Sequence, residues 1–156
     1  MSMRYMKVGL SVLLLGMQMG CTGSTDEERD EVQIKGGKLS MGCDTDTFTC
    51  PDTELPRHSV TLPGYYIDRV EVSAADYADF LNAHGNECAG QPCAADSELF
   101  GSPPILRDGD SWRAVTGREA QAVTMVSWHG ADAYCRYVDA RLCSESELSL
   151  IHISEP

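Results

Sequence analysis

The alternation of apolar and polar side chains predicts several short strands in the first half of the chain. Residues 57–62 (RHSVTL) alternate with a period of two, which is typical of a half-buried strand. Residues 65–72 (YYIDRVEV) are rich in aromatic and β-branched side chains, and Pro63-Gly64 predicts a turn between the two segments. A further short strand is expected in residues 38–43.

A helical period replaces the strand pattern after residue 73. Ser73 and Asp76 have the spacing of a capping box, in which side chains satisfy the first N–H groups of a helix. Apolar side chains follow at helical spacing, and Gly85 is placed to end the helix. We therefore expect His84 to be the last helical residue rather than a ligand.

The second half of the chain begins with small residues and prolines, which predict a loop over residues 86–104. Two β-prone pieces about Asp108-Gly109 predict a hairpin. An apolar strand-like run over residues 122–127 leads into a helix from about Trp128. Ser144 and Glu147 have the spacing of another capping box, so a further helix is expected there.

The first 20 residues have the organisation of a bacterial secretion signal. Arg4 and Lys7 form a basic start, and an apolar run over residues 8–17 follows it. The run is shorter than the roughly 20 residues that a transmembrane helix needs. Gly20 followed directly by Cys21 resembles the lipobox of bacterial lipoproteins. We therefore predict a cleaved signal peptide over residues 1–20 and lipidation of Cys21.

The segment after Cys21 is small, polar and charged, with too little apolar surface to fold. We predict that residues 21–37 are a disordered, lipidated tether that holds the protein to a membrane. Thr22 stands where an aspartate would favour the inner membrane, so the expected location is the outer membrane of the cell envelope.

The charge balance argues against one class of partner. The chain of 156 residues has 12 basic and 24 acidic side chains and a formal net charge of −12. Nucleic-acid binding requires basic patches, so no nucleic-acid partner is expected. A length of this order allows one domain, or part of one.

Six cysteines beyond Cys21 predict disulfides, because they are even in number and the chain is expected to be exported. Six cysteines allow 15 connectivities. Here they form three close pairs, so we expect the bonds Cys43–Cys50, Cys88–Cys93 and Cys135–Cys143.

Metal ligation is the weaker interpretation of these residues. Zinc sites use closely spaced cysteines such as C-x2-C, and only Cys88-x4-Cys93 approaches that spacing. The acidic loop after Cys43 fails the calcium-loop pattern, because Phe48 stands at a ligand position. No metal ligand is therefore assigned.

Several short motifs occur in a fixed order between residues 39 and 147. They are Met41-Gly42, Glu54-x-Pro56-x-His58-x-Val60-x-Leu62, Tyr66-Ile67-Asp68-x-x-Glu71-Val72-Ser73, Tyr77-x-x-Phe80, Val126-Ser127-Trp128, Ala131-x-Ala133-Tyr134-Cys135 and Arg141-Leu142-Cys143-Ser144-Glu145-x-Glu147. No single motif is specific. Together, and in this order, they resemble the formylglycine-generating enzyme, or sulfatase-modifying factor, family.

The resemblance implies an α+β fold of the C-type-lectin-like kind, loop-rich, with short strands, few helices and disulfide staples. Residues 38–147 would be the N-terminal part of that domain, so the fold would be incomplete. Leu148 stands where the family has tryptophan, and residues 148–156 (LSLIHISEP) resemble a translated sequencing adapter. We expect the chain to be truncated after about residue 147, with a non-native tail. Ala122 and Gly130 replace the usual proline and aspartate without threatening the fold.

The resemblance also implies a choice of functions. Family members that make formylglycine oxidise a sulfatase cysteine with molecular oxygen, using copper held by two cysteines in the C-terminal half. This chain ends before that half, so no catalytic residue is assigned in it and no cofactor is expected in it, although the complete domain would admit copper and calcium. A binding or structural module is ranked first, and an oxidase acting on a protein or peptide second. A non-haem iron relative would need a His-x3-His-x-Glu pattern, which none of the four histidines provides.

Overall fold

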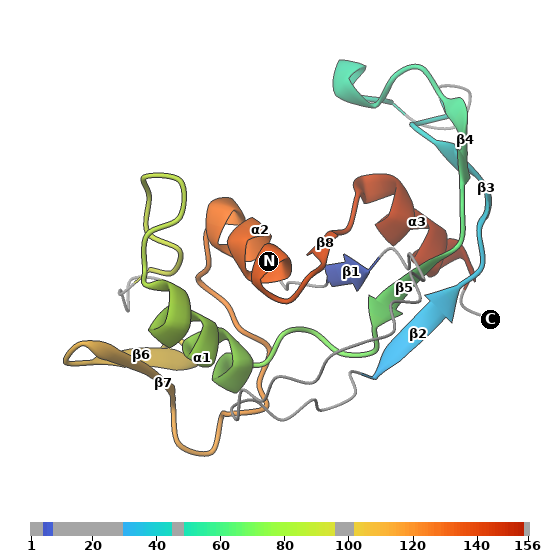
Figure 1. The fold of residues 1–156 in the computed structure, drawn as a ribbon. Coiled ribbons are helices and arrows are strands. Elements are labelled where there is room, and N and C mark those ends of the chain that lie inside the picture. Colours follow the sequence, from blue (N-terminus) through green and yellow to red (C-terminus); the bar gives the residue numbers. More distant parts are fainter. Residues whose placement is uncertain (1–4, 8–29, 45–48, 96–101, 155–156) are drawn as a thin grey trace.

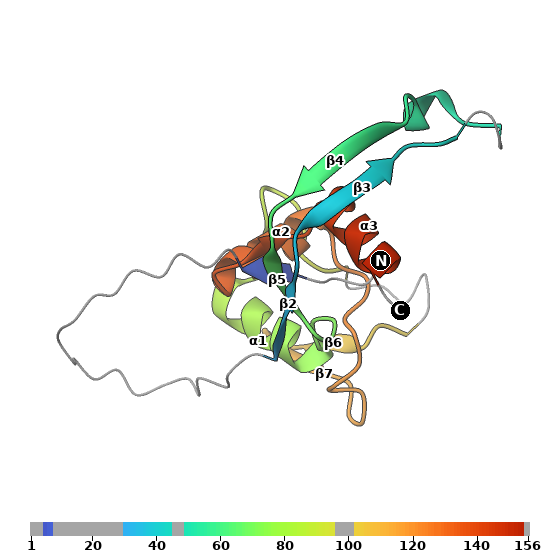
Figure 2. The same cartoon turned by 90° about the vertical axis from the view of Figure 1, so that its right-hand side faces the viewer.

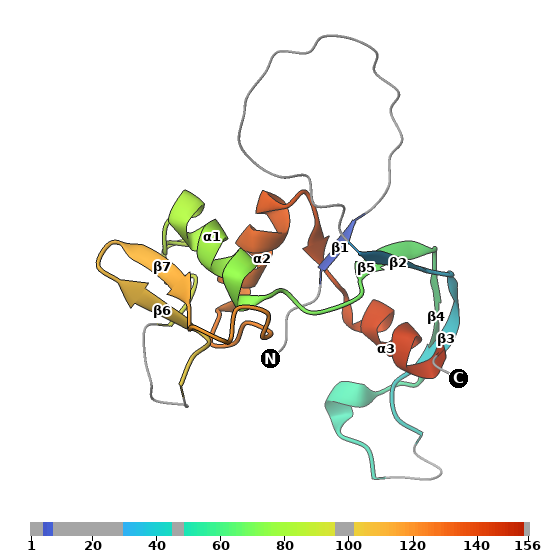
Figure 3. The same cartoon turned by 90° about the horizontal axis from the view of Figure 1, so that it is seen from below.

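The computed structural model describes residues 5–7, 30–44, 49–95 and 102–154, with the backbone alone for residues 5–7 and 152–154. Two groups of elements lie side by side (Figures 1 and 3). One group holds helices α1 and α2 and the hairpin β6–β7. The other holds β2, β5, helix α3 and the hairpin β3–β4.

A four-stranded antiparallel sheet, with the strand order β2-β5-β1-β8, connects the two groups. Strands β2 and β5 are its members from the second group. Its strands are β2 (Glu31–Ile34), β5 (Tyr65–Asp68), β1 (Tyr5–Lys7) and β8 (Arg141–Leu142). Strand β2 pairs with β5 over its whole length, from Glu31 opposite Asp68 to Ile34 opposite Tyr65. The predicted tether over residues 21–37 is therefore wrong from residue 31 onward, because strand pairing and the packing of Ile34 order this segment.

The hairpin of β3 (Gly37–Met41) and β4 (His58–Leu62) projects from the body of the molecule (Figure 2). Both strands were predicted, and β4 shows the expected alternation, with Val60 and Leu62 less exposed than their neighbours. The 3-10 helix η1 (Asp52–Glu54) lies at the distal end of the hairpin. Helix α3 (Glu145–Ser154) packs against β3 and β4, which closes a small apolar cluster of Leu39, Tyr65, Ile67 and Leu150. Residues 148–154, which were predicted to belong to a non-native tail, continue this helix, and Leu150 is buried in the cluster.

Helix α1 (Ala74–His84) has the ends that the sequence predicts. The backbone N–H of Asp76 donates to Ser73 Oγ at 3.1 Å, which caps the N-terminus. Gly85 ends the helix with a φ of 89°, in the region that glycine adopts without steric cost. The helix buries Ala74, Tyr77, Ala78, Phe80 and Leu81, so its apolar stripe faces the larger core.

The larger core is closed by α1, α2 (Trp128–Tyr137) and the hairpin of β6 (Ile105–Asp108) and β7 (Ser111–Ala114). Ser127 Oγ accepts from the N–H of Gly130 at 3.0 Å and caps α2. The predicted strand over residues 122–127 is wrong, because Ala122 and Val126 make only isolated bridges, to Ser73 and Ala94. The run instead crosses the core, where Val123 is completely buried.

These elements make an α+β domain with few helices, short antiparallel strands and two disulfides, as predicted. Within the described residues, no helix combines the length and the apolar character needed to cross a bilayer.

Candidate functional site

A groove of about 580 Å³ opens between the distal end of hairpin β3–β4 and helix α3. Glu54, His58 and Glu145 supply its titratable side chains. His58 Nδ1 lies 2.9 Å from the carbonyl oxygen of Pro56, so that carbonyl orients the ring. The groove is closed on the apolar side by Met41 and Leu55. The two carboxylates and the apolar side chains can bind a segment that carries basic and apolar groups.

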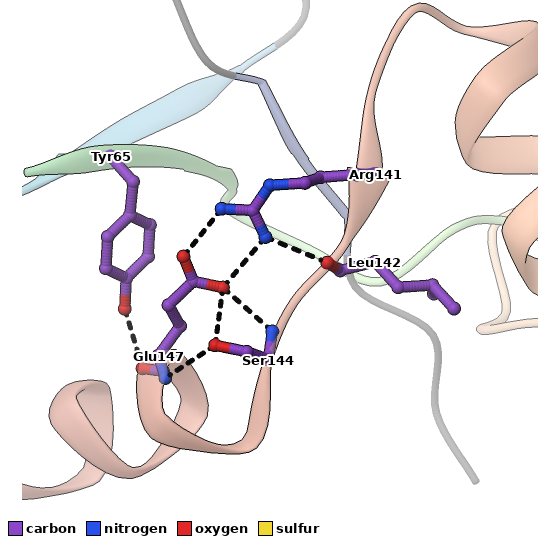
Figure 4. Close-up of polar contacts among 5 residues, drawn as sticks. All are labelled: Tyr65, Arg141, Leu142, Ser144 and Glu147. Carbon is purple, nitrogen blue, oxygen red and sulfur yellow. Dashed lines mark hydrogen bonds and ion pairs between the residues drawn. The ribbon is translucent and has the colours of Figure 1, made fainter. Parts of the chain in front are cut away.

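A polar cluster around the buried Glu147 carboxylate fixes helix α3 against the sheet (Figure 4). The Arg141 guanidinium donates to both carboxylate oxygens of Glu147, at 2.7 and 3.0 Å. Glu147 also accepts from the backbone N–H and the hydroxyl of Ser144, at 2.8 and 2.9 Å. The N–H of Glu147 donates back to Ser144 Oγ at 3.3 Å, which confirms the predicted capping box. Tyr65 donates to the carbonyl oxygen of Glu147 at 2.6 Å, and this bond joins α3 to β5.

The electrostatics of this cluster suit a structural role. Burial acts to raise the pKa of Glu147, but the hydrogen bonds from Arg141 and Ser144 outweigh it and hold that pKa below its usual value. Burial, with the nearby Glu147 charge, raises the pKa of Tyr65 to about 12. The carboxylate is ionised and saturated with donors. It therefore fixes α3 in place and is a poor general base.

Two of the three predicted disulfides are present. Cys43–Cys50 closes the loop at the distal end of hairpin β3–β4, and Cys88–Cys93 closes a tight loop after α1. The first pair lies beside an exposed segment, whereas Cys88 and Cys93 are both buried in the larger core. The close spacing within each pair was the signal that identified them.

The predicted Cys135–Cys143 disulfide is wrong, because both residues carry thiols in the structure. Cys135 lies on the buried face of α2 in the larger core, while Cys143 packs against the smaller core. Strand β8 lies between Cys135 and Cys143 in the sequence and ends at Leu142. Successive side chains of an extended segment point to opposite faces, so Leu142 packs against the larger core and Cys143 against the smaller one. Burial, with a smaller contribution from Cys143, raises the pKa of the Cys135 thiol to about 12.

The described cysteines do not form the copper site that the resemblance implies for a complete domain. Where the structure describes side chains, the one group of three metal-ligating residues whose ligand atoms lie close together is His84, Cys88 and Cys93. It contains neither Cys135 nor Cys143. Neither Cys135 nor Cys143 is therefore assigned as a copper ligand, and the expectation that this chain holds no cofactor stays a prediction.

The predicted lipidation site, Cys21, lies outside the described residues, as does most of the predicted signal peptide. Tyr5–Lys7, within that predicted signal, forms strand β1 between β5 and β8. His84 is the last residue of α1, as predicted, and its side chain lines a second cleft together with His129 of α2. Sequence reasoning missed both the groove at α3 and this cleft, since each is lined by residues far apart in the chain.

The structure places the chain in the class of α+β domains with short strands and disulfide bonds. Comparison with known proteins identifies the family. The family model of the sulfatase-modifying factor enzyme 1-like domain matches residues 20–150 of this chain. The chain therefore belongs to the sulfatase-modifying factor family, as its ordered motifs predicted. The match begins well before residue 38, in agreement with the pairing of strand β2.

Individual relatives agree with this assignment. The chain is 30% identical over 142 residues to the formylglycine-generating enzyme of Streptomyces coelicolor, covering 76% of this chain and 45% of that protein. It is 29% identical over 147 residues to the formylglycine-generating enzyme of Mus musculus, covering 74% and 37%. It is also 30% identical over 120 residues to the serine/threonine-protein kinase Pkn1 of Chlamydia trachomatis, covering 73% and 18%. The chain thus spans less than half the length of each of these relatives.

Proposed function

We propose that this chain is the N-terminal part of an envelope-tethered lipoprotein whose sulfatase-modifying-factor-like domain serves as a binding or structural module. The proposal is carried by the structural roles that several reactive side chains have in the described part of the chain. Four cysteines are in disulfides, the Cys135 thiol is buried in the core, and the Glu147 carboxylate is consumed by Arg141 and Ser144. These groups hold the fold together, and a binding surface remains beside them.

A second observation supports a module. The relative from Chlamydia trachomatis is named a serine/threonine-protein kinase, and the matched segment is only 18% of its length. A segment similar to this chain therefore occurs as a small part of a protein that carries a different name. Because a fold does not fix a function, membership of the family does not by itself make this chain an oxidase.

We place partner binding at the groove between hairpin β3–β4 and α3. The carboxylates of Glu54 and Glu145 and the partly exposed Leu55 suit a peptide with one basic and one apolar side chain. Fluorescence anisotropy with short peptides of that composition tests this. The double variant Glu54→Gln/Glu145→Gln should weaken binding several-fold, while Asp108→Asn, on hairpin β6–β7, should leave it unchanged. Equal binding by all three proteins would remove the groove from the proposal.

Attachment to the membrane rests on Cys21, the lipobox-like Gly20-Cys21 and the apolar run before them. Processing at Cys21 would place the domain outside the cytoplasm, where the disulfides at Cys43–Cys50 and Cys88–Cys93 persist. Thr22 favours the outer membrane as the destination. Export and disulfide bonding therefore support each other.

Strand β1 makes a competing prediction. Removal of residues 1–20 would take Tyr5–Lys7 out of the sheet and leave β5 and β8 with the edges that β1 now pairs. A retained N-terminus would keep β1 in place, whereas a processed one would require another strand or solvent at these edges. The two possibilities differ in the mass of the mature protein.

Mass spectrometry of the protein isolated from a bacterial membrane fraction tests the tether. We expect an N-terminus at Cys21 that carries acyl chains, and incorporation of labelled fatty acid that Cys21→Ser abolishes. Cys143→Ser is the matched control and should retain the label. An unprocessed N-terminus that includes Tyr5–Lys7 would refute the tether and would make β1 a permanent strand.

A formylglycine-generating oxidase is the second candidate, because the relatives from Streptomyces coelicolor and Mus musculus carry that name. Here the protein encoded by the complete gene would convert the cysteine of a Cys-x-Pro-x-Arg peptide to formylglycine. Mass spectrometry of such a peptide, incubated with the complete protein and copper, distinguishes the two functions. Turnover of the peptide would overturn the module, and an unchanged peptide supports it.

A further inference from the structure

The loop closed by Cys88 and Cys93 lies directly beside the C-terminal end of α1. Ligand atoms of His84, Cys88 and Cys93 all lie within 4.8 Å of one another. Cys88 and Cys93 are 3% and 0% exposed, whereas His84 faces solvent. The residues have the spacing His-x3-Cys-x4-Cys, so one helix end and one short loop supply all three potential ligands.

The backbone holds this loop closed independently of the sulfur–sulfur bond. The N–H of Cys88 donates to the carbonyl oxygen of Gln91 at 2.7 Å, and the N–H of Gln91 donates back to Cys88 at 3.1 Å. The side chain of Asn86 bonds both backbone groups of Ala94, accepting at 2.8 Å and donating at 3.2 Å. Breaking the disulfide therefore leaves Cys88 and Cys93 next to each other.

The imidazole of His84 is held in an orientation that suits a ligand. Its ring stacks on Phe80 with the centroids 5.0 Å apart. Its Nδ1 lies 3.3 Å from the carbonyl oxygen of Gly85. A histidine that donates from one ring nitrogen to a backbone carbonyl keeps a lone pair on the other, which is the usual arrangement of metal-bound histidines. Nε2 is therefore the nitrogen available to a metal.

A cleft of about 400 Å³ is lined by His84 and Cys88, with Glu87 and His129, and Cys93 lies buried behind it. It gives a metal ion an entry path and a place for a fourth ligand, either water or the Glu87 carboxylate. Tetrahedral zinc binds sulfur at about 2.3 Å and nitrogen at about 2.0–2.1 Å, so neighbouring ligand atoms lie within about 4 Å of each other. Small side-chain rotations bring these groups to such positions once the disulfide is open.

We propose that reduction of the Cys88–Cys93 disulfide converts this loop into a zinc-binding site formed by Cys88, Cys93 and His84. The site goes beyond the proposed module function and does not depend on it. Two thiolates and a neutral imidazole balance the charge of one Zn²⁺ ion. The same two sulfur atoms serve either the disulfide or the metal, so the redox state decides which one closes the loop, and only the metal would also tie the loop to His84 of α1.

The chemistry needs a dithiol reductant. The dithiol gives up two electrons and two protons and becomes a cyclic disulfide, while Cys88 and Cys93 each take one proton and one electron. Binding of Zn²⁺ then releases two protons as both thiols become thiolates. Re-oxidation returns two electrons to a disulfide acceptor, re-forms the sulfur–sulfur bond and expels the ion.

Metal titration of the full chain tests the site. The chain is reduced with a dithiol, freed of reductant under anaerobic conditions and titrated with Zn²⁺, with Co²⁺ as the spectroscopic probe. Cys43→Ser/Cys50→Ser removes the other cysteine pair and should leave the affinity unchanged. We expect one equivalent of Zn²⁺ in the reduced chain, a thiolate-to-cobalt absorption band, and no stoichiometric binding in the oxidised chain.

His84→Ala changes an exposed residue and should not prevent folding. Loss of a second-shell partner alone costs about 10–100-fold in metal affinity, so loss of this ligand should weaken Zn²⁺ binding at least about tenfold. His58→Ala is the matched control and should bind as the unmodified chain does. Three results would each overturn the site: no stoichiometric Zn²⁺ in the reduced chain, equal affinity in His84→Ala, or the cobalt band retained in Cys88→Ser/Cys93→Ser.

Discussion

The two groups of elements differ in the size of the apolar core that each one encloses. Among the described residues, the core between α1, α2 and hairpin β6–β7 contains fifteen buried residues, and the core beneath hairpin β3–β4 contains four. In the larger core, the ring of Phe80 lies within 5.5 Å, centroid to centroid, of Tyr77, Tyr134 and Tyr137. In the smaller core, an ion pair and its hydrogen bonds hold α3 instead.

The two cores are therefore stabilised by different kinds of interaction. Buried aromatic area stabilises the larger core, and its Cys88–Cys93 disulfide lies inside it. The smaller core depends on directed polar contacts, and its Cys43–Cys50 disulfide lies at the distal end of a projecting hairpin. Substitutions that remove apolar volume should therefore act mainly on the larger core, and those that remove charge mainly on the smaller one.

The largest effect is expected from Phe80→Ala. The side chain is completely buried at the centre of the aromatic cluster, and its loss leaves a cavity. We expect the free energy of unfolding to fall by about 3–5 kcal/mol, measured by urea denaturation. Leu39→Ala in the smaller core is the comparison and should cost about 2–3 kcal/mol, because fewer buried neighbours surround it. An equal loss in both variants would contradict the difference between the cores.

Glu147→Gln should have the next largest effect. The change removes a carboxylate, 7% exposed, that pairs with Arg141 and accepts two hydrogen bonds from Ser144. We expect a loss of about 1.5–3 kcal/mol by urea denaturation at pH 7. Asp108→Asn, which breaks the exposed pair with Arg113, is the control and should change stability by less than about 0.5 kcal/mol.

The same residue predicts a pH dependence. The folded protein holds the pKa of Glu147 below the unfolded value of about 4.3. This contribution to stability is therefore complete above the unfolded pKa and is lost as the pH falls through the folded one. The stabilities of the unmodified chain and of Glu147→Gln should converge as the pH falls from about 5 through the unfolded pKa and then through the lower folded one. A constant difference across that range would assign the effect of the substitution to packing.

Gly130→Ala should destabilise the larger core by about 1–3 kcal/mol, because its new Cβ would overlap the carbonyl group of Cys93 and the hydroxyl of Tyr77. Gly37→Ala in β3 is the matched control. Its Cβ would meet Leu150 Cδ1 at an ordinary 3.5 Å, so we expect a change within about 0.5 kcal/mol. Thermal unfolding of both variants measures the difference. Equal melting temperatures would show that the 92–94 segment can move away from α2.

The smallest effects should come from two buried tyrosine hydroxyls. Tyr65→Phe removes the 2.6 Å bond to the Glu147 carbonyl and should cost about 1–1.5 kcal/mol. Tyr77→Phe removes a longer bond of 3.2 Å to the Cys93 carbonyl and should cost about 0.5–1 kcal/mol. Urea denaturation of both variants compares the cores on one chemical change. A larger loss for Tyr77→Phe would reverse the comparison.

Local signals predicted most elements because they act within a few residues. The capping serines at 73 and 144 and the Asp108-Gly109 turn marked real boundaries in the sequence. The strand predicted over residues 122–127 is absent, because strand pairing depends on residues outside the segment. Apolar character says that a segment is buried, but only its neighbours decide whether it pairs as a strand or crosses a core.

The sequence by itself determined the family, the α+β class and the capped helix starts, because each depends on the order and spacing of residues along the chain. Close spacing also predicted Cys43–Cys50 and Cys88–Cys93, but it did not distinguish these pairs from Cys135 and Cys143. Tertiary structure decided which core each side chain enters. It separated Cys135 from Cys143, drew residues 31–34 out of the predicted tether, and brought His84 to the Cys88–Cys93 loop. The physical reason is that pairing partners and buried neighbours come from distant segments, whose meeting no local pattern records.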